Sequence, residues 1–548
     1  MDMFNNYIYL VILFYIFYFF FFFLGRSFFL TYKKIIDKNK ESKVSLLGFD
    51  LELFFPLIGV FILGNIVFLI NFIIPVGNIY FFIIFIFLVI NFIEKINFIS
   101  LKRLIYTTFP ALILIISTYG ASFHYDAGAY HLLNQAWFRE SNIIFGFSNI
   151  YGAFGVSSLW DYVSSLLWFN DSFIFLHFLN ILFILFFYQF IIYSIFVQKD
   201  KFFKNAAYFI LLFSLLDNLG FLGGRNGFIY IQGVSKQDVA ISVLYYVSSL
   251  LMLYSLTKNS YNHMDFFIIS SLVVFIIQLK ISGAVIAIMY FYYFYNFIKY
   301  KQITYRSLLK EIVPLGVLSI FWTIKSIIHS GCLIFPLTAS CMGRLSWVDV
   351  GYLKDIEEVT VDYSRSYYFG SSISDWFKIF TSNDVNSAVV YNFFWSALII
   401  IFISIVLLEK PVKKNLNIFL VFLIILNALF FLRFGPDLRY LMGFQMLLIT
   451  LPSFYVKEIK LKSRLLKIIV VLISIILVPR MQDYQKFNFF SSPNLYTPQV
   501  ELVTENNISH PAVGDQCWIN TDCFQNYRPL IFDEKYNFFQ VVYIGSNQ

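Results

Sequence analysis

Charged residues are scarce in this sequence: Asp, Glu, Lys and Arg together make up 13% of its 548 residues. Soluble proteins contain roughly 25% charged residues. Hydrophobic residues, in contrast, reach 59% here. This composition excludes a soluble globular protein and indicates an integral membrane protein that crosses the bilayer many times. The net charge of +8 is explained by basic loops on one side of a membrane, so no nucleic-acid partner is expected.

Cysteine and the common nucleotide-binding and hydrolase motifs are also lacking. Four Cys residues give neither a disulfide-rich scaffold nor the ligand spacing of a zinc site. The sequence has no G-x-x-x-x-G-K-[ST], no G-x-G-x-x-G after a strand, no G-x-S-x-G and no H-E-x-x-H. Nucleotide hydrolysis and the use of a nucleotide-sugar donor are therefore not expected.

Long apolar runs fill most of the chain. Because a hydrocarbon core of ~30 Å needs about 20 apolar residues per helix, the sequence predicts an all-α integral membrane protein with about fourteen transmembrane helices. The predicted spans are 5–24, 47–72, 79–93, 104–120, 171–197, 206–222, 237–256, 266–280, 283–298, 312–328, 391–408, 416–432, 440–456 and 466–479.

The distribution of Lys and Arg predicts the orientation, because loops rich in these residues stay in the cytoplasm. Most Lys and Arg residues fall in one set of short loops: 25–46, 94–103, 198–205, 257–265, 299–311, 409–415 and 457–465. The amino terminus is then outside, together with amphipathic segments in loops 121–170 and 329–390. The tail 481–548 combines turn formers with a strand-like run, and we expect a small outer α/β appendage there.

Polar residues concentrate in the first outer loop, directly after an apolar helix. Asp126 is flanked by Ala127, Gly128 and Ala129, which leave room for a bulky ligand. A carboxylate in this position can act as a general base on a sugar or lipid hydroxyl. The alternative is that Asp126 caps the next helix, since Asp is a favoured N-cap residue.

Three residues beside Asp126, namely His124, Tyr130 and His131, are candidate substrate contacts. The two His side chains and Asp126 have donor atoms suited to a divalent metal. Positions 124, 126 and 131 do not share one helix face, however, and we favour neither a metal nor another cofactor.

Further ionisable residues fall at the predicted outer ends of helices, where charges mark cavities and functional sites. With Asp126 they would surround one outward-facing cavity: Asp217, Asp238, Lys280, Lys325, Arg433, Asp437 and Arg439. Lys236, in the run V-S-K-Q-D, is a further charge at a helix end. Arg433 and Arg439 flank a Gly-Pro break, and a guanidinium group matches phosphate oxygens in a bidentate way. The alternatives are snorkelling side chains and ordinary ion pairs, such as Arg439 with Asp437.

Two pairs of Cys residues lie close together in the sequence. Cys517 and Cys523 are expected to form a disulfide in an oxidising outer compartment. Cys332 and Cys341 are a second candidate pair.

The order of these features resembles the C-type integral-membrane glycosyltransferases, which take sugars from polyprenyl-phosphate carriers. In both, an early acidic residue lies in the first outer loop, and Arg-Tyr precedes a late helix. Several short motifs are similar to those of an uncharacterised bacterial branch of large polytopic membrane proteins: D-x-G-x-Y-H at 126–131, G-x-x-G at 152–155, S-G-x-x-x-F-P at 330–336, G-P-D-x-R at 435–439 and G-D-Q-C-W at 514–518.

The resemblance implies a glycosyltransferase-like membrane core at 104–480, preceded by extra transmembrane helices in 1–103. It implies that Asp126 is the catalytic base and that Arg439 contacts the carrier phosphate, with Lys236 and Lys280 as further phosphate contacts. The metal-dependent members carry an acidic pair in the first outer loop. Here Asp126 is followed by Ala-Gly-Ala, so metal use is not implied.

The expected function is transfer of a sugar from a polyprenyl-phosphate-linked donor to a hydroxyl of a cell-envelope glycan or lipid. It would take place on the outer face of a bacterial inner membrane. One alternative is a surface-polysaccharide polymerase or ligase, although loop 329–390 carries only Arg344 and Arg365 where such enzymes have Arg-rich loops. The other is a transporter or flippase of lipid-linked precursors, which would place charges at the bilayer midplane.

Overall fold

The computed structural model describes residues 2–36, 45–77, 110–156, 158–169, 172–216, 233–234, 236–301, 305–369, 372–382, 384–409, 414–434, 442–459, 495–505, 508–525, 530–535 and 538–543. Most of these residues are helical, and the strands are short and form separate two-stranded sheets. The predicted helical character is therefore confirmed.

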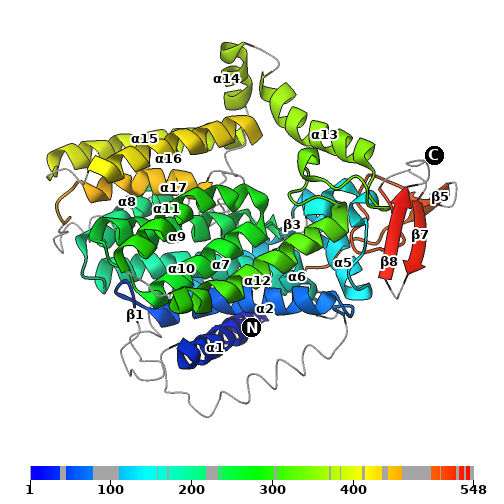
Figure 1. Cartoon of the computed structure of the whole chain (residues 1–548), viewed down its shortest axis with the longest axis horizontal. Helices are drawn as coiled ribbons and strands as arrows, with labels where there is room; N and C mark the ends of the chain where they lie inside the picture. Colours follow the sequence, from blue (N-terminus) through cyan, green and yellow to red (C-terminus); the bar gives the residue numbers. More distant parts are fainter. Residues whose placement is uncertain are drawn as a thin grey trace.

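The apolar helices of the described part are α1 (Asp2–Ile36), α2 (Phe55–Asn71), α7 (Ile174–Phe196), α8 (Lys201–Leu216), α9 (Asp238–Lys258), α10 (His263–Leu279), α11 (Ile286–Lys301), α12 (Tyr305–Ser330), α15 (Asp384–Val406), α16 (Lys414–Phe434) and α17 (Met442–Thr450). Figure 1 shows α7 to α12 in the middle of the molecule, α1 and α2 along one side, and α15 to α17 along the opposite side.

Five apolar stretches of the described part are long enough to cross a membrane: Asn6–Tyr32, Ile174–Phe196, Asp238–Lys258, Ile281–Tyr300 and Leu308–Ser330. Other apolar helices, α2 and α10 among them, are shorter. The predicted spans 79–93 and 466–479 lie outside the described residues. The structure is thus compatible with a membrane protein, but it does not give the predicted number of fourteen spans.

Large apolar side chains are exposed along the outer helices. On α12, Val313, Val317 and Ile320 are between 43% and 59% exposed, and on α15 Phe402 and Ile405 are each 69% exposed. Apolar surface of this extent is unusual for a soluble monomer. It is the surface expected of helices that face lipid acyl chains.

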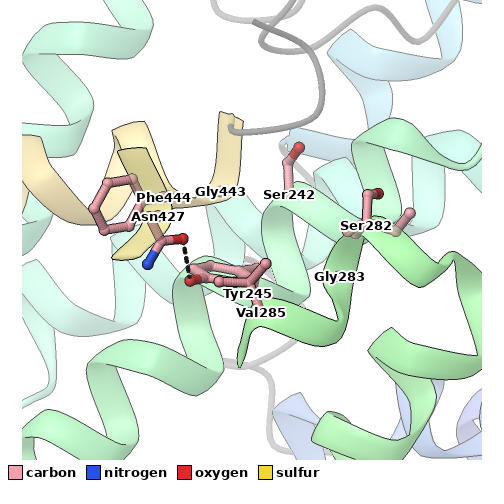
Figure 2. A pocket seen from close by; sticks show the side chains of 9 residues that line it. Ser242, Tyr245, Ser282, Gly283, Val285, Asn427, Gly443 and Phe444 are labelled. Carbon is pink, nitrogen blue, oxygen red and sulfur yellow. Dashed lines mark hydrogen bonds between the residues drawn. The ribbon is translucent and has the colours of Figure 1, made fainter. Parts of the chain in front are cut away.

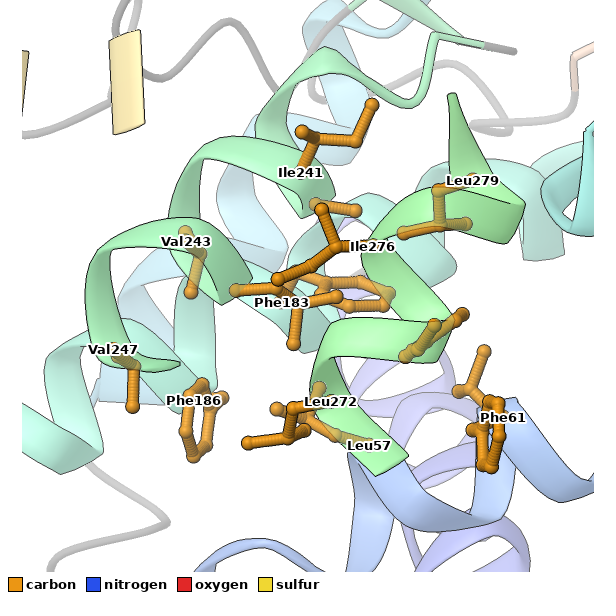
Figure 3. Packing of buried hydrophobic residues seen from close by; sticks show 14 of the residues in the cluster. Leu57, Phe61, Phe183, Phe186, Ile241, Val243, Val247, Leu272, Ile276 and Leu279 are labelled. Carbon is orange, nitrogen blue, oxygen red and sulfur yellow. The ribbon is translucent and has the colours of Figure 1, made fainter. Parts of the chain in front are cut away.

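The core lies where α2, α7, α9 and α10 meet. Figure 3 shows Phe183 and Phe186 of α7 between the side chains of α9 and α10, with Leu57 of α2 beside Leu272 and Phe61 of α2 on the far side of α10. A buried polar contact joins the same layer, because the side-chain amides of Asn65 and Gln278 donate to each other at 3.0 and 2.9 Å. The paired amides satisfy each other and fix how α2 lies on α10.

The connecting segments gather at two ends. At one end, which we call the basic end, Lys204 lies 2.9 Å from Glu458, Lys258 lies 3.2 Å from Asp200, and Lys201 pairs with Glu409. These residues belong to, or lie beside, the segments that the charge distribution places in the cytoplasm.

The opposite end holds β3 (Ser122–Phe123), α5 (Leu132–Glu140), α6 (Leu159–Ser165), β4 (Gly233–Val234), α13 (Val350–Phe369), β5 (Leu502–Glu505), β6 (Ile508–Pro511), β7 (Leu530–Lys535) and β8 (Phe538–Tyr543). Helix α14 (Ile373–Ser382) lies at the top of Figure 1, between α13 and α15. Asn149 donates to the carbonyl groups of Trp347 and Val541, each at 2.9 Å. The first loop, the loop after α12 and the tail therefore meet here.

The tail was expected to be a small α/β appendage. Its described residues contain two antiparallel hairpins, β5–β6 and β7–β8, and no helix. The tail also packs on the first loop, since the Val541 N–H donates to the Phe145 carbonyl at 2.9 Å.

The crossing of α1 and α2 gives a test of this packing. A Cβ atom added to Gly59 would lie 2.0 Å from the Phe21 carbonyl oxygen, which the structure cannot accommodate without moving a helix. Overpacking of this kind costs about 1–3 kcal/mol. We expect Gly59→Ala to lower the thermal unfolding temperature of the purified protein.

The matched control is Gly316→Ala in α12, where an added Cβ would have no neighbour within 4 Å. Because Ala favours a helix over Gly, this variant should be as stable as the parent or more stable. Equal stability of both variants would contradict the observed crossing.

Candidate functional site

Two segments that are far apart in the sequence meet at the non-basic end. Strand β3 pairs with β4 in parallel, with Ser122 opposite Gly233 and Phe123 opposite Val234. The His124 N–H continues this ladder towards the Val234 carbonyl at 3.5 Å. The residues that follow each strand are therefore held side by side, which brings Asp126 next to Lys236.

The Asp126 carboxylate and the Lys236 ammonium form an ion pair, with Nζ 3.2 Å from Oδ2. Their side chains are 24% and 11% exposed, so the pair is largely shielded but open on one side. His124 Nδ1 lies 3.6 Å from the same carboxylate and 3.1 Å from the Asp126 backbone nitrogen. Since the Asp126 N–H donates to Nδ1, the neutral His124 ring carries its proton on Nε2.

Asp126 is a carboxylate at neutral pH. Burial raises the pKa of its carboxyl group, but the Lys236 ammonium, with smaller contributions from His124 and His131, outweighs burial and lowers the pKa below its ordinary value. The residue precedes a π-helical turn at Ala127–His131, and its side chain makes no capping hydrogen bond to that turn. Lys236, not a helix end, is its partner.

A second ion pair lies next to the first. Lys280 Nζ is 2.8 Å from Asp238 Oδ1, and the two side chains are 19% and 15% exposed. Asp238 is in the first turn of α9, two residues after Lys236, and Lys280 is the extended residue between α10 and the 3-10 turn Ile281–Val285. The helix ends thus place two carboxylates and two ammonium groups in one cluster, which we call the charge cluster.

A small pocket lies one helical turn further along α9. Figure 2 shows Ser242 and Tyr245 of α9 on one side of it, Ser282 and Gly283 on another, and Asn427 of α16 with Phe444 of α17 opposite. The Tyr245 hydroxyl donates to Asn427 Oδ1 at 3.1 Å, and the Ser242 hydroxyl donates to the Asp238 carbonyl at 2.7 Å. The pocket is thus joined to the charge cluster through Asp238.

His131 and Tyr130, the other candidate substrate contacts beside Asp126, have partners of their own. The His131 side chain is 6% exposed and lies 3.1 Å from Asp161 on α6. Asp161 also accepts from Asn134 at 3.4 Å and from Gln135 at 3.3 Å. Tyr130 is half-buried, with its ring 4.3 Å from the His131 ring.

Sequence reasoning missed Asp161. It is almost fully buried, at 1% exposure, and holds three donors of α5 and the preceding turn. Its one signal in the sequence is an acidic residue inside the apolar run L-W-D-Y-V. This carboxylate fixes the helix that follows Asp126, so it supports the site indirectly.

Lys325, another predicted site residue, packs against aromatic rings. It is 2% exposed, and its ammonium lies 3.8 Å from the centre of the Trp322 ring and 5.6 Å from that of Tyr162. Of the other predicted residues, Asp217, Asp437 and Arg439 lie outside the described residues. Arg433 is near the end of α16, and the described part does not include its side chain.

Both candidate cysteine pairs are joined, Cys517 to Cys523 and Cys332 to Cys341. Within the described part, no group of three or more His, Cys, Asp and Glu side chains is arranged to hold a metal ion.

These features describe a helical protein with a cluster of shielded charges at the end opposite its basic loops. The chain belongs to the family described as a domain of unknown function (DUF8201), whose model matches residues 7–447. The matched region includes all four members of the charge cluster and ends before the disulfide-bonded tail. No curated protein and no solved structure matches the chain.

The Asp161 network gives a test that needs no knowledge of activity. Asp161→Ala would leave His131, Asn134 and Gln135 without their acceptor, and each unsatisfied buried donor costs about 1–3 kcal/mol. We expect this variant to unfold at a clearly lower temperature than the parent. Asp161→Asn keeps one acceptor oxygen and should lose less stability, and equal losses would contradict the assigned network.

Proposed function

We propose that this protein is a glycosyltransferase that acts on the outer face of a bacterial inner membrane. It would move a sugar from a polyprenyl-phosphate-linked donor to a hydroxyl of a cell-envelope glycan or lipid. The observation that supports this proposal is the charge cluster, in which a carboxylate suited to act as a base lies 3.2 Å from a lysine. A second lysine, Lys280, forms the other ion pair of the cluster, so a phosphate would meet two ammonium groups there.

The lysines of the charge cluster would bind the donor phosphate. Each is paired with one carboxylate in the free protein, Lys236 with Asp126 and Lys280 with Asp238. A phosphate group brings more negative charge than either carboxylate and offers several acceptor oxygens, so it competes for both ammonium groups. Arg439, which lies outside the described residues, keeps its predicted role as a third phosphate contact.

Asp126 would act as the general base. Its carboxylate accepts the proton of the acceptor hydroxyl, and the hydroxyl oxygen forms a bond to the anomeric carbon of the donor sugar. The bond between that carbon and the phosphate oxygen breaks, and its electron pair leaves with polyprenyl phosphate. The lowered pKa of Asp126 keeps its carboxyl group ionised at neutral pH, which is the form that a general base requires.

Stabilisation of the leaving phosphate should be the larger contribution to catalysis. Preorganised donors aimed at developing charge contribute on the order of 3–4 kcal/mol each in known enzymes. The shielding of Lys236 and Lys280 strengthens this effect, since charges interact more strongly where water is excluded.

The difference between the two ends of the molecule supports the proposed orientation. The basic end carries Lys201, Lys204 and Lys258 and would face the cytoplasm, as Lys and Arg in short loops do. The charge cluster would then face outwards. Its position at the helix ends favours a reaction at the membrane surface over transport through the midplane.

The donor site can be tested by mass spectrometry of lipids that co-purify with the full-length protein under mild extraction. We expect a polyprenyl phosphate or its glycoside with the parent and with Lys236→Arg/Lys280→Arg, which keeps both cations. The variant Lys236→Ala/Lys280→Ala should lose it. The control is Lys204→Ala, which removes a paired lysine at the basic end and should retain the lipid. Absence of such a lipid from the parent would count against a lipid-phosphate donor.

The base can be tested with Asp126→Asn, which keeps the shape of the side chain and removes its ability to accept a proton. We expect turnover to fall about 10²–10⁴-fold, as for other general bases, while donor binding is retained. Turnover is measured as release of polyprenyl phosphate from the bound donor when envelope glycans are added. Asp375→Asn, at an exposed carboxylate on α14, is the control. Full activity of Asp126→Asn would overturn the assignment.

A further inference from the structure

The segment that follows β6 lies directly on the Asp126 turn. We call residues 515–525 the tail loop; it is closed by the disulfide between Cys517 and Cys523, whose side chains are fully buried. The family match ends before this loop. Nothing in the proposed chemistry requires it, yet its residues form hydrogen bonds along the segment 125–140.

Hydrogen bonds join the tail loop to the backbone around Asp126. The Trp518 N–H donates to the Gly128 carbonyl at 3.0 Å, and the Gln516 side chain donates to the Tyr125 carbonyl at 2.9 Å. The Gln525 side chain donates to the Ala129 carbonyl. One carbonyl group before Asp126 and two after it thus accept hydrogen bonds from the tail loop. The loop therefore fixes the backbone that carries the carboxylate.

Side-chain contacts complete this arrangement. The Tyr125 hydroxyl donates to the Asp515 carboxylate, and the Thr521 hydroxyl donates to Glu140 Oε2 at 2.7 Å. The Trp518 ring also packs edge-to-face on Phe123, the last residue of β3, with the ring centres 5.3 Å apart. The tail loop therefore spans the whole segment from β3 to the end of α5.

Trp518 and Gly128 fit each other closely. A Cβ atom on Gly128 would lie 2.7 Å from the Trp518 ring, so only glycine allows this approach. Trp518 has a φ of +54°, in the left-handed region that residues other than glycine rarely adopt. Such a conformation persists where the surrounding contacts determine it, and such residues cluster at functional sites.

We propose that the tail loop is a positioning element of the Asp126 site and that it works only when its disulfide is closed. Trp518 and Gln516 hold the turn that places Asp126 against Lys236, without touching substrate themselves. Reduction of Cys517–Cys523 releases the tail loop and leaves the turn free to move. The effect on catalysis rests on the proposed function, but the effect on the turn does not.

The chain provides a matched control in its other disulfide. Cys332–Cys341 closes a loop that packs on a different segment, where Phe335 contacts Gly155. We would measure hydrogen–deuterium exchange by mass spectrometry on the full-length protein in detergent, for Cys517→Ser/Cys523→Ser and for Cys332→Ser/Cys341→Ser.

We expect the variant Cys517→Ser/Cys523→Ser, the tail variant, to exchange about tenfold faster or more in peptides covering 121–131, because the hydrogen-bond partners of the carbonyl groups in this turn would be lost. The variant Cys332→Ser/Cys341→Ser should exchange in these peptides as the parent does. Peptides from α9 should be unchanged in both variants. Unchanged exchange at 121–131 in the tail variant, or equal acceleration by both variants, would overturn the proposal.

A second pair of variants separates positioning from folding. Gly128→Ala displaces the Trp518 ring and leaves the disulfide intact, and it should reproduce the faster exchange at 121–131. Trp518→Phe keeps an aromatic ring and should retain most of the protection that Trp518→Ala loses. Parental exchange in Gly128→Ala would contradict the role of this contact.

The functional readout distinguishes the two proposals. If both hold, the tail variant keeps its co-purified donor lipid but turns it over at least tenfold more slowly than the parent. Faster exchange at 121–131 in a protein whose parent form binds no lipid would support the tail loop as a positioning element and overturn the glycosyltransferase. If the parent binds the lipid and is active, but the tail variant shows unchanged exchange at 121–131, the glycosyltransferase is supported and the role of the tail loop is overturned.

Discussion

The ion pair between Asp126 and Lys236 is the interaction on which the rest of the site depends. It exists because two short strands, β3 and β4, pair in parallel and hold two distant loops in register. A buried charge without a partner is costly, so each residue requires the other to be present and correctly placed. Asp238, at the start of α9, and Lys280, directly after α10, form the second ion pair of the charge cluster. The helices around them serve to bring these four residues together.

The sequence was sufficient to predict much of the helical part, because apolar runs such as 174–196 and 238–258 are long and uninterrupted. Boundaries were less predictable. The span expected to begin at 47 begins as helix α2 at Phe55, since Pro56 fits the first turn of a helix and the preceding residues form a small hairpin. The span predicted at 266–280 corresponds to α10, which has 17 residues and is shorter than the five stretches long enough to cross a membrane.

The site could be predicted only in part, and burial explains why. Asp126, Lys236, Asp238 and Lys280 were recognised as charges at helix ends, but no sequence pattern says which carboxylate pairs with which lysine. His131 and Lys325 are also ionisable residues at predicted outer positions, yet the fold buries His131 against Asp161 and Lys325 against Trp322. Distinguishing them requires knowledge of how α6 and α12 pack. A single sequence does not contain this information in readable form.

The position of the tail loop in the chain has a consequence for the order in which the site is assembled. Asp126 and its turn are synthesised early, whereas Gln516, Trp518 and Gln525 are added only after α17 and the following segment. A chain still on the ribosome at α17 therefore contains all four residues of the charge cluster but not the partners of the 125, 128 and 129 carbonyl groups. These carbonyl groups gain their partners only after the tail loop has been synthesised.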